Sequence, residues 1–309
     1  MSLVVALLSV DALVLDSRVP KKTVAVVGAS GNVGKLVTRR LLDEGHAVRA
    51  VVRTPQSADR LAAFLDDATP EVRVADIADP GSDLEAALGG VAAVVVCTGT
   101  TAFPTTAWAG GDVGVDDVPR VVLATWWECG FDVRATIDKL SERGMQTPDV
   151  VDAVGVERLA AALGDDLDHV VLMSSLGVTR RTAFPFTILN AAGVLDAKAR
   201  GEAAVVCAAR ARGAAFTILR PGQLFGPPYD NDTYLGTIAK LDKDLGTRAV
   251  AIAKGDDAAG DTLRSTLADV IVQALHTPAV RNTDFTVLTV KGPSPSKNDL
   301  AAQLEAALA

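Results

Sequence analysis

The chain has 309 residues, of which 49% are hydrophobic, and its formal net charge at pH 7 is −8. This length and apolar content suffice for one large α/β domain or two small ones. The acidic balance excludes an electrostatic nucleic-acid binder as the expected class, because the chain has no basic run and only 4% aromatic residues. We therefore expect no nucleic-acid partner.

Residues 1–20 open with an apolar run from Leu3 to Leu8, which Asp11 and Asp16 then interrupt. The run is too short to cross a bilayer. It also lacks the basic start of a secretory signal and the Arg- and Ser-rich composition of a transit peptide. We interpret residues 1–20 as a leader of unknown role and expect no membrane span.

From residue 23 onward, apolar β-branched runs alternate with Ala-rich segments that carry their charges on one side. We expect strands at 23–28, 47–52, 71–75, 91–97, 169–173, 214–219, 249–253 and 285–290. We expect helices near 32–45, 56–66, 82–89, 150–163, 190–212, 231–244, 265–276 and 296–308. The alternation predicts an α/β fold, a doubly wound parallel sheet of Rossmann-like type, within residues 21–309. A small C-terminal lobe would face the substrate.

One region, about residues 109–147, disturbs this alternation. It contains Gly110-Gly111 and the adjacent pair Trp126-Trp127, and it is long for a connection in a compact domain. Paired tryptophans usually mark packing or an interface. We interpret the region as a peripheral insert that could bind a protein partner, with a lid over the site and a poorly folding segment as alternatives.

A glycine-rich turn follows the first expected strand, in the run Thr23 to Gly34. Gly28 permits a tight turn, Gly31 lets the backbone approach a ligand, and Gly34 lets the helix pack against the strand. The helix start offers free N–H groups and a positive dipole end, which suit a pyrophosphate. The candidate residues for a dinucleotide are Gly28, Ser30, Gly31, Asn32, Val33 and Gly34.

A nucleoside-triphosphate loop is a poor alternative. That motif needs a glycine where the chain has Ala29, and a hydroxyl where it has Leu36 after Gly34-Lys35. No side chain at Leu36 could ligate magnesium, so an ATPase or GTPase is not expected.

Arg53 stands at the end of the second expected strand, about 19 residues past Gly34. A site that prefers NAD places an acidic residue here to accept from the ribose 2′-OH. A guanidinium can instead clamp a 2′-phosphate, so the sequence favours NADP(H), with NADPH preferred over NADH. The alternative is a solvated arginine at a strand end.

Further cofactor contacts are expected where other strands end, because ligands of such sheets lie outside the carboxyl ends of the strands. Asp76, followed by Ile77, could accept from an adenine amino group. Thr98 and Gly99 form a small turn that would leave room for a ribose. Pro221 and Gly222 could shape a wall beside the nicotinamide, or form only a rigid loop.

The cysteines and histidines give no metal or redox motif. Cys97, Cys129 and Cys207 are far apart without a CxxC pair, and we expect Cys97 and Cys207 in the core. His46, His169 and His276 are also scattered, so no metal site can be assembled from sequence, and each is expected at a surface or helix end.

These motifs, together with Ser174-Ser175 and Arg220-Pro221-Gly222, resemble the atypical short-chain dehydrogenase/reductase superfamily. The chain is most similar to the NmrA-like NAD(P)-binding group, which includes plant and cyanobacterial chloroplast-type members. The resemblance covers about residues 23–290 apart from the insert. It implies a chloroplast location, with the cytoplasm as the alternative.

The resemblance also implies a catalytic set of a Ser with Tyr and Lys spaced YxxxK on one helix, where the Lys binds the nicotinamide ribose. Lys198 fits the Lys position, but Val194 stands four residues earlier and cannot transfer a proton. Neither Tyr229 nor Tyr234 lies in register, although both could line the substrate side. The catalytic candidates are Ser174, Ser175 and Lys198, with Glu202 as an expected ion-pair partner of Lys198.

Two functions remain open on this sequence. The first is an oxidoreductase in which NADPH gives a hydride to a small organic acceptor, such as a quinone-like or isoflavone-like compound. The second is a non-catalytic NADPH-binding redox sensor or assembly factor, which the missing tyrosine and the Trp126-Trp127 region favour.

Overall fold

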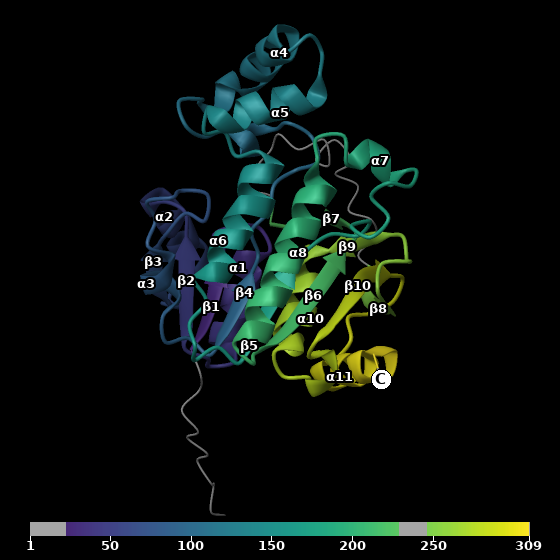
Figure 1. Cartoon of the computed structure of the whole chain (residues 1–309). Coiled ribbons are helices and arrows are strands. Elements are labelled where there is room, and N and C mark those ends of the chain that lie inside the picture. Colours follow the sequence, from purple (N-terminus) through teal and green to yellow (C-terminus); the bar gives the residue numbers. More distant parts are fainter. Residues whose placement is uncertain (1–22, 229–245, 309) are drawn as a thin grey trace, which may run out of the picture.

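The computed structural model describes residues 23–228 and 246–308, which form a large sheet with helices on both faces (Figure 1). The sheet has eight strands in the order β3-β2-β1-β4-β5-β6-β10-β8. Its strands are β1 (Val24–Val27), β2 (Val48–Val52), β3 (Glu71–Val74), β4 (Ala93–Val96), β5 (His169–Met173), β6 (Ala215–Pro221), β8 (Ala249–Lys254) and β10 (Thr283–Val290). All neighbours are parallel except β8, which pairs antiparallel with β10 at one edge.

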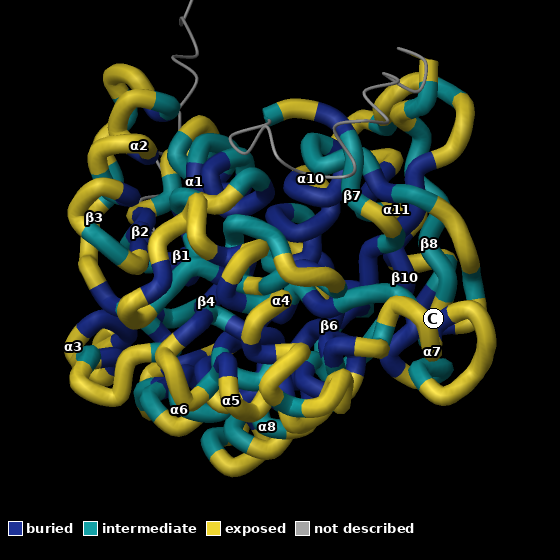
Figure 2. The backbone as a smooth tube through the Cα atoms, turned by 90° about the horizontal axis from the view of Figure 1, so that it is seen from above, coloured by how far each residue is buried: buried dark blue, intermediate teal, exposed yellow. Residues whose placement is uncertain are grey.

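The sheet is most deeply buried at its centre, where β1 pairs with β2 and β4. All four residues of β1 are buried, as an unbroken Val-Ala-Val-Val run requires of a strand that is covered on both faces. In Figure 2 buried segments gather around β4, β6 and α10, whereas many exposed segments lie at the periphery and at α4, which crosses the middle of this view. At the edge, all four residues of β3 are exposed.

Two groups of helices cover the two faces. One face carries α1 (Gly34–Asp43), α2 (Pro55–Leu65), α10 (Arg264–Ala274) and α11 (Lys297–Leu308). The other carries α3 (Leu84–Leu88), a π-helical turn at Asp149–Gly155, α6 (Val156–Ala161) and α8 (Val194–Ala211). Each group packs apolar side chains into its own core cluster. The predicted doubly wound, Rossmann-like fold is therefore confirmed.

The region around residues 109–147 lies above the carboxyl ends of the strands (Figure 1). It contains α4 (Val118–Glu128) and α5 (Val133–Glu142), which pack on a small core of their own around Trp108 and Leu140. Trp127 is 72% exposed on α4. None of the helices in the described ranges is long and apolar enough to cross a bilayer.

The eight expected strands are all present, and the sequence analysis missed several short elements. These are α4, α5, α7 (Phe186–Leu189) and a separate parallel pair, β7 (Gln223–Phe225) with β9 (Asp261–Leu263). The expected leader 1–20, the helix at 231–244 and both tyrosines lie outside the described residues. Two predictions of burial were wrong: Cys207, expected in the core, is exposed on α8, and His169, expected at a surface or helix end, is buried at the start of β5.

Candidate functional site

The glycine turn after β1 has the close contacts that its residues predict. Gly28 has a φ of +77°, and a Cβ on Gly34 would lie 2.1 Å from the Gly28 carbonyl oxygen. The amide N–H of Gly31 donates to that same oxygen at 3.0 Å. No side chain caps the start of α1 at Val33, and the Lys35 N–H, at the second position of the helix, donates to the Gly31 carbonyl at 2.9 Å.

A cavity of about 400 Å³ opens beside this turn, at the carboxyl ends of β1 to β4. Nine of the predicted cofactor residues line it, namely Gly28, Ser30, Gly31, Asn32, Arg53, Asp76, Ile77, Thr98 and Gly99. Its upper wall includes Thr106, Ala107, Val115 and Gln146, which belong to the region of α4 and α5 or flank it. Val33 and Gly34 are buried beneath the turn rather than on the cavity wall.

One end of the cavity is basic. Arg53 and Arg60 both line it, and Arg60 donates from Nη2 to Ser57 Oγ at 2.9 Å. Burial, and then the nearby Arg60 charge, lower the pKa of Lys35. The sequence analysis missed Arg60, although it lies only seven residues after Arg53, on α2.

The next part of the wall is formed by the ends of β3 and β4. Asp76 is half-buried, and its Oδ1 accepts from the Ala78 N–H at 2.9 Å. Cys97 also lines the cavity, and burial raises the pKa of its thiol to about 12. The Cys97 thiol therefore stays protonated at neutral pH and is a poor nucleophile.

Lys198 approaches the cavity behind Gly99. Its Nζ lies 2.7 Å from Oδ1 of Asp152, whose side chain is 3% exposed. The other oxygen of Asp152 accepts from the amide and the hydroxyl of Thr100, at 3.0 and 2.6 Å. A Cβ on Gly99 would lie 3.1 Å from Lys198 Nζ, so the ion pair packs closely behind this glycine.

The sequence analysis expected Glu202 as the partner of Lys198, and the structure corrects this. Glu202 accepts from Arg220 through both carboxylate oxygens, at 3.0 and 2.7 Å. It is buried on α8, four residues after Lys198. Asp152 is the partner that was missed; its only sequence signal is a carboxylate within an apolar helical segment.

Ser174 belongs to the same buried hydrogen-bond network as Glu202 and Arg220. Its hydroxyl donates to Glu202 Oε1 at 2.5 Å. Arg220 also pairs with Asp284, and although burial opposes its charge, the two carboxylates raise the pKa of Arg220. Ser174 shares a small void with Lys198 and Asp152, so the structure brings two of the catalytic candidates together.

Val194 occupies the position where the resemblance implies a tyrosine. It is 5% exposed and packs with Val178, Phe186 and Leu195 in a small apolar cluster. A hydroxyl at this place would be buried among apolar side chains rather than presented to the cavity.

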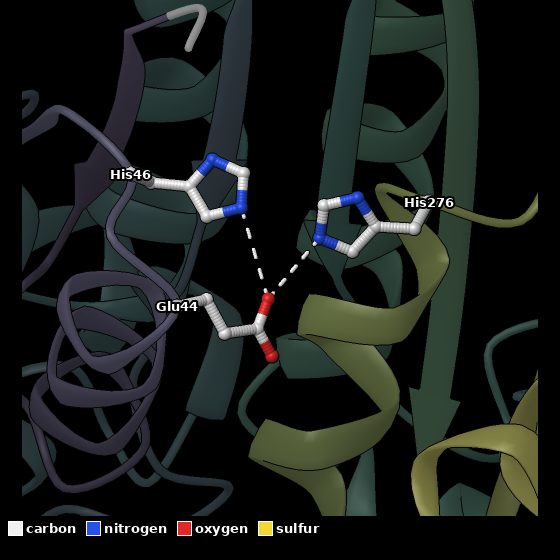
Figure 3. Close-up of side chains that lie close together, drawn as sticks. All are labelled: Glu44, His46 and His276. Carbon is white, nitrogen blue, oxygen red and sulfur yellow. Dashed lines mark ion pairs between the residues drawn. The ribbon is translucent and has the colours of Figure 1, made fainter. Parts of the chain in front are cut away.

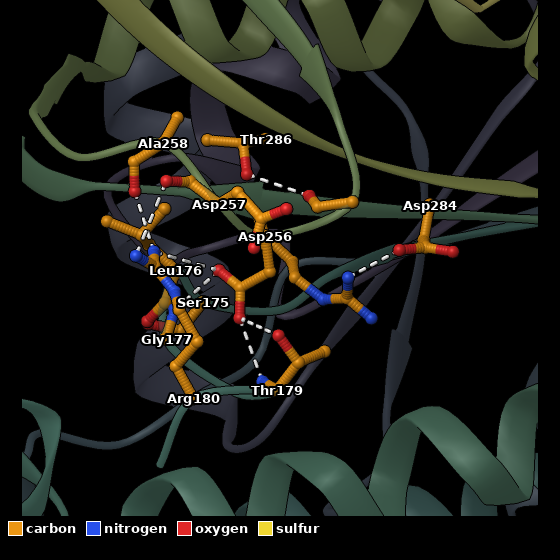
Figure 4. Close-up of polar contacts among 12 residues, drawn as sticks. Ser175, Leu176, Gly177, Thr179, Arg180, Asp256, Asp257, Ala258, Asp284 and Thr286 are labelled. Atoms are coloured by element: carbon orange, nitrogen blue, oxygen red, sulfur yellow. Dashed lines mark hydrogen bonds and ion pairs between the residues drawn. The ribbon is translucent and has the colours of Figure 1, made fainter. Parts of the chain in front are cut away.

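Ser175 lies in the loop after β5, which Asp256 holds in place (Figure 4). Ser175 Oγ donates to the Leu176 carbonyl at 3.2 Å. Asp256 accepts from the Gly177 amide at 2.7 Å and from the amide and hydroxyl of Thr179 at 2.8 and 2.9 Å. This loop is therefore anchored by a buried carboxylate from the segment after β8.

Pro221 and Gly222 are not on the wall of the cavity. Pro221 is buried at the end of β6, opposite Val287 of β10. The Gly222 amide donates to Thr262 Oγ1 at 2.9 Å, and a Cβ on Gly222 would lie 2.0 Å from the Gly260 carbonyl oxygen. Both residues join β6 to the strand pair β7 and β9.

Comparison with known proteins agrees with this geometry. A family model described as NAD(P)H-binding matches residues 28–278. The chain is 29% identical over 217 residues to Protein TIC 62, chloroplastic, of Oryza sativa, covering 66% of this chain and 35% of that protein. It is 26% identical over 213 residues to an uncharacterised chloroplastic protein of Arabidopsis thaliana, covering 69% and 63% of the two chains. The chain thus spans only part of the length of these relatives.

Solved structures show the same fold at low identity. A putative NAD-dependent epimerase/dehydratase from Bacillus halodurans is 18% identical with a TM-score of 0.58, covering 92% of this chain and 99% of that one. A short-chain dehydrogenase/reductase from Veillonella parvula in complex with NADP is 14% identical with a TM-score of 0.52, covering 89% and 99%. The family match spans most of the sheet and the glycine turn, and the chain belongs to the NAD(P)H-binding family of NmrA-like, atypical short-chain dehydrogenase/reductase type.

Proposed function

We propose that this protein is an NADPH-dependent reductase of a small organic acceptor. The observation that carries the proposal is a single cavity with the glycine turn in its wall, two arginines at one end, and Lys198 behind Gly99 at the other. Gly28 and Gly34 have no side chains that could block a diphosphate, and a Cβ at either position would contact neighbouring atoms closely.

The preference for NADPH over NADH rests on Arg53 and Arg60. Two guanidinium groups beside Ser57 supply several donors to a 2′-phosphate, whereas a bare 2′-OH would gain little from them. We expect Arg53→Ala to weaken NADPH binding by about tenfold or more and to leave NADH binding nearly unchanged. Fluorescence titration of reduced nicotinamide measures both, and an equal loss for both cofactors would contradict the assignment.

Lys198, Asp152, Ser174 and Ser175 are the proposed reaction-side residues. NADPH, when bound, supplies a hydride, and the protein supplies position and protons. Lys198 is 11% exposed and is held by Asp152, which fixes its ammonium next to the Gly99 turn, where the nicotinamide ribose would lie. Ser174 donates to Glu202, so its oxygen can accept a hydrogen bond from a ligand while its proton stays on the buried network.

The reductase proposal is tested by turnover. The full chain is saturated with NADPH, and the absorbance of the reduced nicotinamide is followed with a panel of quinones, enones and aldehydes. We expect turnover with at least one acceptor class, and its loss in Lys198→Ala. Lys139→Ala is the matched control, since Lys139 is exposed on α5 and pairs with Glu128. NADPH binding without turnover across the panel would contradict the reductase proposal for these acceptors.

A second candidate function is a non-catalytic NADPH sensor or assembly factor. Two features favour it: the buried Val194 at the tyrosine position, and the exposed aromatic cluster of Trp126, Trp127 and Phe131 at the end of α4. Such a cluster is typical of an interface with a protein partner. Under this function, NADPH would bind tightly and Lys198→Ala would change only affinity.

We also propose a chloroplast location, as the names of the rice and Arabidopsis relatives suggest for those proteins. Protease-protected uptake of the full chain by isolated chloroplasts tests this, and retention of the chain outside the organelle would favour the cytoplasm.

A further inference from the structure

Three side chains meet at the amino-terminal edge of the sheet, away from the cavity (Figure 3). Glu44 caps the carboxyl end of α1, His46 precedes β2, and His276 follows the end of α10. His46 and His276 are far apart in sequence, and only the packing of α1 beside α10 brings them together. Within the described parts of the chain, this is the group of His, Cys, Asp and Glu residues whose geometry suits a metal ion.

The distances within the group are close to those of a metal centre. Oε2 of Glu44 lies 3.7 Å from His46 Nε2 and 3.3 Å from His276 Nε2. One ligand atom from each residue lies within 4.8 Å of the others. Ligand atoms bound to one tetrahedral Zn²⁺ at its usual bond lengths lie about 3.3 Å apart. A small turn of the two rings would therefore complete the geometry.

Both imidazoles present Nε2 to the same carboxylate oxygen, as Figure 3 shows. Their rings are stacked, with centroids 5.1 Å apart and planes 27° apart. Lys297 Nζ lies 2.5 Å from the other oxygen, Oε1, which leaves Oε2 for the histidines. The Lys297 side chain is 73% exposed and can move into solvent as a cation enters.

The local charge also suits a cation. The group lies just beyond the carboxyl ends of α1 and α10, whose dipoles place partial negative charge there. An adjoining cavity of about 300 Å³, which Glu44 and Lys297 line, also carries Asp43, Asp269 and Arg40, and Arg40 pairs with Asp269.

We propose that Glu44, His46 and His276 bind one divalent d-block cation of the Zn²⁺ class, through Oε2 and the two Nε2 atoms. Two imidazoles and one carboxylate are ligands that suit Zn²⁺ and exclude a preference for Mg²⁺, which selects oxygen ligands. Water would take the fourth position. The ion would join the first βα unit to α10, and its role would be to stabilise the fold rather than to take part in chemistry at the distant cavity.

The test uses the full chain without a histidine tag. Isothermal titration with Zn²⁺ should give one site, and saturating Zn²⁺ should raise the melting temperature. His276→Ala should weaken Zn²⁺ binding by about tenfold or more and should abolish the shift in melting temperature. His276 is partly exposed beyond a helix end, so the variant is expected to fold, which circular dichroism checks. Glu44→Gln should behave in the same way.

The matched control is Asp43→Asn, which removes the same charge one residue earlier in the chain. It should keep the Zn²⁺ affinity of the natural chain, and equal losses in Asp43→Asn and Glu44→Gln would overturn the site. The exposed Cys207 is the competing ligand. Binding of Co²⁺ should give a d–d spectrum without a thiolate charge-transfer band, and a thiolate band that persists in His276→Ala would also overturn the proposal. An absence of Zn²⁺ binding would leave the group as an ion-pair cluster.

Discussion

The cavity and the buried region behind it are built in different ways. The end beside β1 and β2 uses residues close together in the chain, from the glycine turn to Arg60, and its arginine side chains are exposed. The second end of the site lies behind the cavity, beside β5 and β6. It uses residues far apart in the chain, and its charges are buried in pairs, Lys198 with Asp152 and Arg220 with Glu202. The arginines of the first end can pair with negative charge on a ligand. The charged side chains of the second end already pair with one another.

The difference between exposed arginines and buried ion pairs affects how each end can act on a ligand. A buried ion pair gains little net stability because both charges lose their hydration, but breaking it leaves one charge without compensation. The reaction end is thus rigid and electrostatically satisfied, and Val194 supplies no acid there. Binding of the cofactor and reaction of the substrate should respond separately to mutation.

The largest effect is expected at the buried pair of Glu202 and Arg220. Glu202→Ala should lower the free energy of unfolding by about 3–5 kcal/mol, because Arg220 would remain buried beside only Asp284. Urea unfolding measures this. Glu142→Ala, at an exposed position of α5, is the control. The double variant Glu202→Leu with Arg220→Met should lose less than Glu202→Ala, and a larger loss would contradict the pairing argument.

The glycine turn gives the next largest effect. Gly34→Ala should weaken NADPH binding by about a hundredfold, because its Cβ would lie 2.1 Å from the Gly28 oxygen and would displace the turn. Fluorescence titration measures the affinity. Gly164→Ala is the matched control, since a Cβ there meets no atom within 4 Å. Unchanged affinity in Gly34→Ala would mean that the turn does not bind the diphosphate.

The buried histidine of β5, His169, should make the stability of the fold depend on pH. Burial, followed by the nearby Arg281 charge, lowers its pKa from 6.5 to about 4. Its Nε2 lies 2.8 Å from Thr217 Oγ1, which itself donates to the Val280 carbonyl, so Nε2 carries the proton and donates. Protonation would then fall on Nδ1, a buried atom with no hydrogen-bond partner in the described structure.

Protonation of His169 links the free energy of unfolding to pH. The folded pKa lies below the unfolded one, so the unfolded chain binds the extra proton, and stability falls as pH drops from about 6.5 toward about 4. Between pH 7 and pH 5 this histidine should remove about 2 kcal/mol from the free energy of unfolding. Urea unfolding at both values measures it. In His169→Gln that part of the pH dependence should disappear, and an unchanged slope would contradict it.

The smallest effect concerns Arg60, which shares the basic end with Arg53. Arg60→Ala should weaken NADPH binding by about fivefold, since an exposed guanidinium is screened by solvent, and should not change NADH binding. Arg134→Ala, an exposed arginine on α5, is the control. An Arg60 effect larger than that of Arg53 would reverse the proposed order of the two contacts.

The local order of the chain determined much of the fold. The apolar β-branched runs and the Ala-rich helices between them placed all eight strands of the sheet. A central strand such as β1 needs such a run because it is buried on both faces, whereas β3 at the edge is exposed. The glycine turn, Arg53, Asp76 and the Thr98-Gly99 turn could be assigned to one edge because parallel strands end at the same edge.

Only the tertiary structure decided the rest. Asp152 belongs with Lys198, and Glu202 with Arg220, because α8 packs against the π-helical turn and β6, which no local pattern encodes. The meeting of His46 with His276 has the same origin. Periodicity and turn residues act over a few positions, whereas the pairing of buried charges depends on which distant elements share a face, and that is fixed by the packing of the whole chain.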